Sequence, residues 1–180
     1  MVASAAAVVA FWQKAGPDRW FTKDPAFDDE IRERFLATYE AAAAGQLSGW
    51  EQSAEGTLAL LILLDQFPRN MFRGEARAFA TDPLARAITA GAIVRGFDSQ
   101  VPKEMRNFFY LPFEHSEDLA DQERGIALNK ASGDEENLKW TEIHADIIRR
   151  FGRFPHRNAV LGRTTTPDEQ AFLDSGGFAG

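Results

Sequence analysis

The stretch Leu58–Leu64 (LALLILL) decides the fold of this chain. All of its residues are apolar, so a helix through them is apolar on every side and belongs at the centre of a core. Ser53 is suited to cap the start of this helix. Pro68 disfavours helical geometry at Phe67, so we expect the helix to end there. The run is far too short to span a bilayer.

Helix signals recur outward from this stretch along the whole chain. Phe27, Ile31, Phe35 and Tyr39 recur every four residues and give the apolar stripe of an amphipathic helix. Caps, apolar spacing and stops at Gly or Pro predict helices over 4–14, 24–44, 53–66, 75–80, 82–95, 102–111, 116–130 and 134–151, and a short one from 166. No segment has the alternating pattern of a strand.

The sequence therefore predicts an all-α fold. We expect a single domain over residues 1–180, made of stacked antiparallel helical hairpins in a tetratricopeptide-like arrangement, because the turns between the helices are short. A chain of 180 residues is long enough for one sizeable core. The Gly-rich end, residues 175–180, is expected to fray.

Composition excludes several classes of function. The net charge of −7 argues against a nucleic-acid partner, which needs a basic surface. The chain has no cysteine, so thiolate metal sites and disulfides are excluded, and a cytoplasmic location fits. Met1–Phe11 is apolar but lacks a basic start, so we interpret it as a helix and expect no membrane partner. No Walker loop or dinucleotide fingerprint is present, and we expect no cofactor.

Four long stretches carry a resemblance to a known family. They are GPDRWFTKDPAF (16–27), LLDQFPRNMFRGEARAFATD (63–82), YLPFEHSEDLADQER (110–124) and HADIIRRFGRFPHRNAVLG (144–162). In this order they resemble a widespread bacterial family, a domain of unknown function described as having a tetratricopeptide-repeat-like helical fold. The resemblance covers nearly the whole chain and is weakest over 129–140. It implies a stack of helical hairpins and implies no activity.

One phrase occurs twice within these stretches, as Phe67–Asn70 (FPRN) and Phe154–Asn158 (FPHRN). A helix end is enough to explain each Phe-Pro pair. Arginine offers five donors and Asn can satisfy polar groups in a turn, so the remaining residues could hold an anion. The ligand-binding candidates are Arg69, Asn70, His156, Arg157 and Asn158. The alternative is that both arginines pair with carboxylates at two similar corners.

A second candidate site is the cluster Glu114, His115 and Asp118, which we expect at the start of a helix. Residues three or four apart share a helix face, so a carboxylate could orient His115 as a general base. The alternative is simple capping, because acidic residues near a helix N-terminus meet the positive end of its dipole.

The remaining candidates are cationic. Arg149–Arg163 holds five arginines and one histidine, which could grip a phosphate or pair with acidic residues of other helices. His144 shares a helix face with Trp140 and Ile148, which favours a core histidine bonded to a carbonyl or carboxylate. No two histidines have the spacing of a helical zinc motif, so we predict no metal site.

Three functions stay open at this point. The first is a binding protein whose polar groove takes a small anionic ligand or a peptide. The second is a hydrolase that uses His115 with Asp118 or Glu114 as its base and arginines as charge support. The third is a scaffold or self-associating protein, in which the 15 Phe residues serve a protein interface. The sequence does not decide whether the protein is an enzyme.

Overall fold

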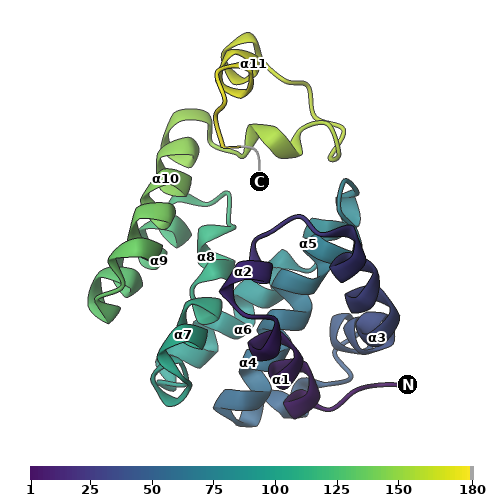
Figure 1. The fold of residues 1–180 in the computed structure, drawn as a ribbon. Helices are drawn as coiled ribbons and strands as arrows, with labels where there is room; N and C mark the ends of the chain where they lie inside the picture. Colours follow the sequence, from purple (N-terminus) through teal and green to yellow (C-terminus); the bar gives the residue numbers. More distant parts are fainter. Residues whose placement is uncertain (179–180) are drawn as a thin grey trace. The chain divides into compact units, whose positions relative to one another are not determined.

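The computed structural model describes residues 1–178, which form helices and turns without any strand (Figure 1). They divide into two compact units. The first unit comprises Met1–Arg73 and Arg77–Pro112, and the second comprises Gly74–Ala76 and the chain from Phe113 onward. The all-α prediction is therefore confirmed, while the single domain and the tetratricopeptide-like stacking stay predictions.

Most helices begin and end within a few residues of their predicted bounds. The α-helices are α1 (Ala5–Ala15), α2 (Pro17–Trp20), α3 (Pro25–Ala43), α4 (Ala54–Leu61), α5 (Phe67–Met71), α6 (Asp82–Val94), α7 (Lys103–Arg106), α8 (Leu111–Glu114), α9 (Leu119–Ser132), α10 (Glu135–Phe151) and α11 (Pro167–Asp174). Short 3₁₀ helices lie at Ser48–Gln52 (η1), Ala76–Phe79 (η3), Asp98–Gln100 (η4), Asn107–Phe109 (η5) and Pro155–Arg157 (η6). A π-helical segment, η2, follows α4 at Ile62–Gln66.

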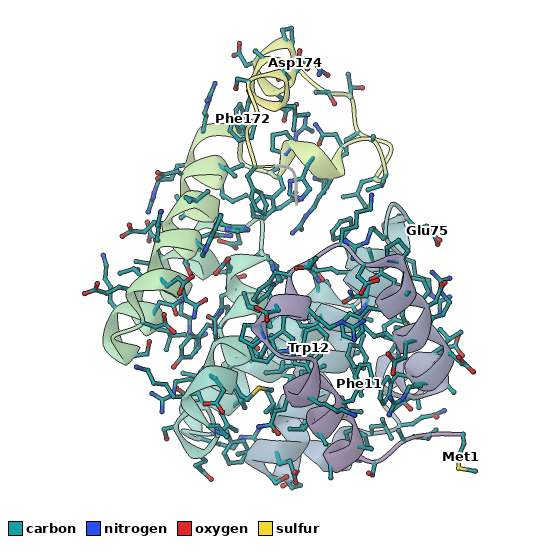
Figure 2. The ribbon with its side chains drawn as sticks, in the orientation of Figure 1. Met1, Phe11, Trp12, Glu75, Phe172 and Asp174 are labelled. Atoms are coloured by element: carbon teal, nitrogen blue, oxygen red, sulfur yellow. The ribbon has the colours of Figure 1, made fainter. Side chains whose placement is uncertain are left out.

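The first unit is built around α4 and η2, as the sequence predicts. Every residue of Leu58–Leu64 is at most 2% exposed. Aromatic rings pack beside them, among them Phe11 and Trp12 of α1, which Figure 2 labels. The ring of Phe67 contacts the rings of both residues edge-on. Burial of these large side chains supplies most of the driving force for folding this unit.

The predicted helix end at Pro68 is wrong. Phe67 is helical (φ −58°, ψ −35°), and helical structure continues through Pro68 to Met71. A proline ring normally clashes with the carbonyl four residues earlier, here that of Leu64. The π-helical turn relieves this conflict, and the Leu64 carbonyl instead accepts a hydrogen bond from the hydroxyl of Thr81, at 2.6 Å.

The predicted helix over 102–111 is also wrong. The chain there forms three separate short turns, α7, η5 and α8. Pro112 does not end a helix but is the second residue of α8, where its missing N–H would have had no partner in the helix.

The second unit is organised by a helical hairpin. Helices α9 and α10 lie side by side (Figure 1) and are joined only by Gly133 and Asp134. Gly133 ends α9 in the left-handed conformation (φ 68°), and the side chain of Asp134 caps α10. Helix α11, the short helix predicted from 166, begins with a capping box of Thr166 and Glu169.

The Gly-rich end of the chain continues this unit. After α11 the backbone turns at Gly176 (φ 78°), and Gly177 N–H donates to the Phe172 carbonyl at 3.0 Å. Of the residues 175–180 that we expect to fray, 179 and 180 lie outside the described residues. In the described part of the chain, no helix is both long and apolar enough to cross a membrane.

Candidate functional site

The second unit brings together all three histidines of the chain. His115 lies between α8 and α9, His144 on α10, and His156 in η6. The ring centroids of His115 and His144 are 6.3 Å apart. The ring of Phe154 lies 5.6 Å from both His144 and His156. We call His115, His144 and His156 the histidine cluster.

Local structure explains how the third histidine returns to the second. Helix α10 ends at Gly152, which is left-handed (φ 68°) and reverses the chain. Phe154 is then extended (φ −89°, ψ 108°), unlike the helical Phe67 of the first copy of the phrase. The Phe154 N–H donates to Glu117 Oε1 at 2.9 Å, which fixes the start of η6.

His144 is buried, with 6% of its surface exposed. Its Nδ1 lies 2.8 Å from the Trp140 carbonyl oxygen and 3.1 Å from Glu114 Oε1. Burial lowers the pKa of His144 to about 3, and repulsion by His115, Arg157 and His156 adds to this, against the hydrogen bond to Trp140. The imidazole is therefore neutral at pH 7, with its proton on Nδ1 between two acceptors and a lone pair on Nε2.

The carboxylate beside His144 is itself held from a second side. Glu114 is 4% exposed and accepts a hydrogen bond from Thr141 Oγ1 at 2.7 Å. Asn129 Nδ2 in turn donates to Thr141 Oγ1 at 2.9 Å. This chain of hydrogen bonds links α9 and α10 to the segment that carries His115, and it orients both Glu114 and His144.

Arg157 lies within the same cluster and is only 6% exposed. Its Nη1 donates to the His115 carbonyl oxygen at 3.1 Å, and its guanidinium lies 4.4 Å over the Phe154 ring. A guanidinium held by a carbonyl and an aromatic face loses little further freedom on binding an anion. Asn158, fully buried, donates from Nδ2 to Glu169 Oε2 at 3.1 Å.

The last residue of the described chain also reaches the cluster. The ring of Phe178 lies 4.4 Å from that of His144 and 5.4 Å from that of His156, in edge-to-face geometry. Sequence reasoning missed this residue, because it stands in a Gly-rich end that carries no periodic signal. Its contact depends on the turn at Gly176 and Gly177.

The acidic segment after Glu114 has mixed roles. Asp118 is exposed and caps α9, accepting from the Ala120 N–H at 2.8 Å. Glu117 forms two hydrogen bonds with Arg163, both 2.8 Å. Burial raises the pKa of Glu117, but the bonds from Arg163 and the Phe154 N–H outweigh burial and lower it. Helix α9 begins at Leu119, so these residues precede the helix that we expected them to open.

The other candidates, Arg69 and Asn70, lie in the first unit. Arg69 holds both carboxylate oxygens of Asp82, at 3.1 and 3.0 Å, and also approaches Asp65. Burial lowers the pKa of Arg69, but these two carboxylates outweigh burial and raise it. Asn70 donates to Asp28 Oδ1 at 2.8 Å. Each residue is thus bound to carboxylates of its own unit.

Metal chemistry has no support among the described residues. Within residues 1–178, no three His, Asp or Glu side chains come together in a way that could hold a metal ion.

The sequence signal that could have found the Glu114–His144 pair is the shared apolar face of α10, which predicts a buried histidine that needs a partner. The identity of that partner depends on how α8 meets α10.

Comparison with known proteins places this chain in a family. The sequence model of a family described as "Bacterial protein of unknown function (DUF924)" matches residues 8–177. The chain belongs to this family. It is also similar to a solved structure described as a protein of unknown function, ATU0120, from Agrobacterium tumefaciens. The two sequences are 54% identical, the match covers 95% of this chain and 97% of that one, and the TM-score is 0.92.

No curated protein matches this chain. The family and its helical fold are therefore shown, and the family resemblance noted in the sequence is confirmed. Neither description names an activity.

Proposed function

We propose that this family member binds a small organic anion, a carboxylate or a phosphate, at the histidine cluster of the second unit. The observation that carries the proposal is that His115, His156 and Arg157 gather around the buried His144, so that three separate segments of the chain contribute. A group of cationic or protonatable side chains that are partly shielded from water favours an anion.

The burial of each side chain indicates its role in binding the anion. Arg157 provides a fixed positive charge, and the partly exposed His115 and His156 provide donors that solvent can reach. The buried His144, neutral at pH 7, takes part through the lone pair on its Nε2 or by supporting its neighbours. Glu114 is the acidic group closest to His144, and its hydrogen bonds from Thr141 and His144 compensate part of its charge.

The first copy of the phrase is not needed for this proposal. Arg69 and Asn70 already hold carboxylates of the first unit, so we assign them to that network and not to the ligand. Asn158 supports the site indirectly, because its bond to Glu169 fixes the segment that carries His156 and Arg157.

The enzyme alternative has a histidine–carboxylate contact that the sequence did not suggest. Asp118 caps α9, and Glu114 lies in contact with His144. A buried imidazole whose pKa lies near 3 is a weak base at neutral pH. We therefore prefer ligand binding to general-base catalysis.

The experiment is an NMR titration of the imidazole C–H signals, of which this chain has only three sets. Inorganic phosphate and succinate are added in separate series at constant ionic strength. We expect saturable shifts of the His115 and His156 signals with each anion. Arg157→Met should weaken binding at least about tenfold.

The matched control is Arg149→Met. Arg149 belongs to the same unit but is exposed and paired with Asp146 at 2.6 Å. Loss of binding in the Arg157 variant alone supports the site. Equal loss in both variants, or shifts that never saturate in the wild-type protein, would sink the proposal and indicate only general ionic screening.

A further inference from the structure

The second unit also contains a cavity whose lining includes none of the histidines and not Arg157. It has a volume of about 380 Å³, within the usual size range of small-ligand sites. Its walls come from the end of α10 and the start of α11. The lining residues are Arg150, Phe151, Arg153, Thr166, Asp168 and Glu169.

The charges at the base of this cavity are already balanced. Arg153 holds both carboxylate oxygens of Glu169, at 2.6 and 2.8 Å, and also donates to the Thr164 carbonyl. The hydrogen bond from Arg153 and that from the Thr166 N–H lower the pKa of Glu169 to about 2, so it stays ionised in this pair. The base of the cavity therefore attracts neither an anion nor a cation strongly.

Two further charges line the same cavity and are not balanced. Arg150 comes from α10 and Asp168 from α11. Within residues 1–178, neither forms an ion pair with another side chain, whereas Arg149 beside them pairs with Asp146. A ligand with charge of only one sign would form an ion pair with either Arg150 or Asp168 and would leave the other residue without one.

Arg150 also lies over two aromatic rings. Its guanidinium lies 4.5 Å over the ring of Phe151 and 5.6 Å over that of Phe172. Figure 2 labels Phe172 on α11, and its ring packs against Phe151 at 5.2 Å. A guanidinium over aromatic rings keeps its N–H donors, which can bind a carboxylate with two parallel bonds.

We infer that this cavity binds a small zwitterion, an amino acid or the like, with its carboxylate on Arg150 and its ammonium group on Asp168. The aromatic rings behind Arg150 give a surface for an apolar side chain. This inference does not rest on the proposed anion site, because the two share no residue. Both charged groups are exposed, so we expect weak, millimolar binding.

The test compares three ligands that differ in one charge each. L-Leucine carries both charges, N-acetyl-L-leucine lacks the ammonium group, and L-leucinamide lacks the carboxylate. Each is titrated into the full chain, and binding is followed by the backbone amide signals of Phe151 and Thr166. We expect leucine to bind about fivefold more tightly than either analogue.

Two variants assign the charges to their residues. Arg150→Gln should weaken leucine about fivefold and leave leucinamide unchanged, while Asp168→Asn should weaken leucine and leave N-acetyl-leucine unchanged. Asp168→Glu keeps the charge at the start of α11 and should retain binding, which controls for any effect on the helix itself. Arg149→Gln is the matched control for Arg150.

The outcomes separate this inference from the proposed function. Saturable leucine binding that follows these variants, in a protein that ignores phosphate and succinate, upholds the zwitterion site and refutes the anion site. Equal binding of all three ligands, or no saturable leucine shift, overturns the inference whatever the anion titration shows.

Discussion

The buried His144 gives a quantitative prediction about acid stability. Its pKa falls from the ordinary 6.5 to about 3 in the folded chain, so the unfolded chain takes up the proton first as pH drops. Well above pH 6.5, the titration of His144 leaves the free energy of unfolding unchanged. As the pH falls below about 6.5, the free energy of unfolding decreases progressively. Between about pH 8 and pH 5 the loss from this one group is about 2 kcal/mol.

The perturbation is His144→Asn, because an Asn amide can place a donor where Nδ1–H points toward the Trp140 carbonyl. Urea unfolding followed by far-ultraviolet circular dichroism, at both pH values, gives the free energy of unfolding of each protein. The wild-type chain should lose about 2 kcal/mol more than the variant over this interval. His115, His156 and Arg157, which repel a proton on His144, are present in both proteins.

Glu114 provides the result that would refute this reasoning. Its Oε1 is 3.1 Å from Nδ1, so an ionised Glu114 could hold a protonated His144 as an ion pair. The pKa would then rise, and acid would stabilise the wild-type chain relative to the variant. A wild-type protein that loses the same free energy as His144→Asn, or less, shows that this attraction exceeds the effect of burial.

Three more substitutions test separate parts of the structure by urea unfolding or NMR. Arg69→Met should cost about 3 kcal/mol, because it removes both hydrogen bonds from the guanidinium to the buried Asp82 carboxylate, and adding Asp82→Asn should recover part of the loss. Thr141→Val removes a donor to the buried Glu114 and should cost about 1–3 kcal/mol; no loss would mean that the network adds nothing. Gly177→Ala puts a methyl group 2.5–2.6 Å from the Phe172 ring and so disturbs the turn that brings Phe178 to His144 and His156. The imidazole signals should therefore shift; unchanged signals would show that the last turn tolerates a side chain.

Sequence reasoning predicted the helices well wherever the signal was local. The stripe of α3, the apolar α4, the helix expected over 134–151 and the short helix expected from 166 all agree with the structure. Each depends on residues a few positions apart along the chain. For the same reason the prediction was wrong at Pro68, where the distant Thr81 bonds the Leu64 carbonyl, and over 102–111, where η5 contacts α4 and α6.

The candidate site shows the same division. The sequence singled out Glu114, His115, His156 and Arg157, and the structure adds that they lie in one unit with His144. The sequence could not show that Glu114 lies beside His144, since that depends on where Glu114 meets α10. Nor could it show that Phe178 packs on the cluster.

The sequence by itself determined the class of this protein: an all-α, acidic, cysteine-free chain with a buried apolar helix and the motifs of its family. Tertiary structure alone decided which polar side chains meet. The two Phe-Pro phrases look alike, yet Arg69 faces Asp82 while Arg157 lies beside His115 and the ring of Phe154. Helix formation depends on neighbours within about one turn of the chain, whereas the partner and the charge state of a buried polar group depend on everything packed around it.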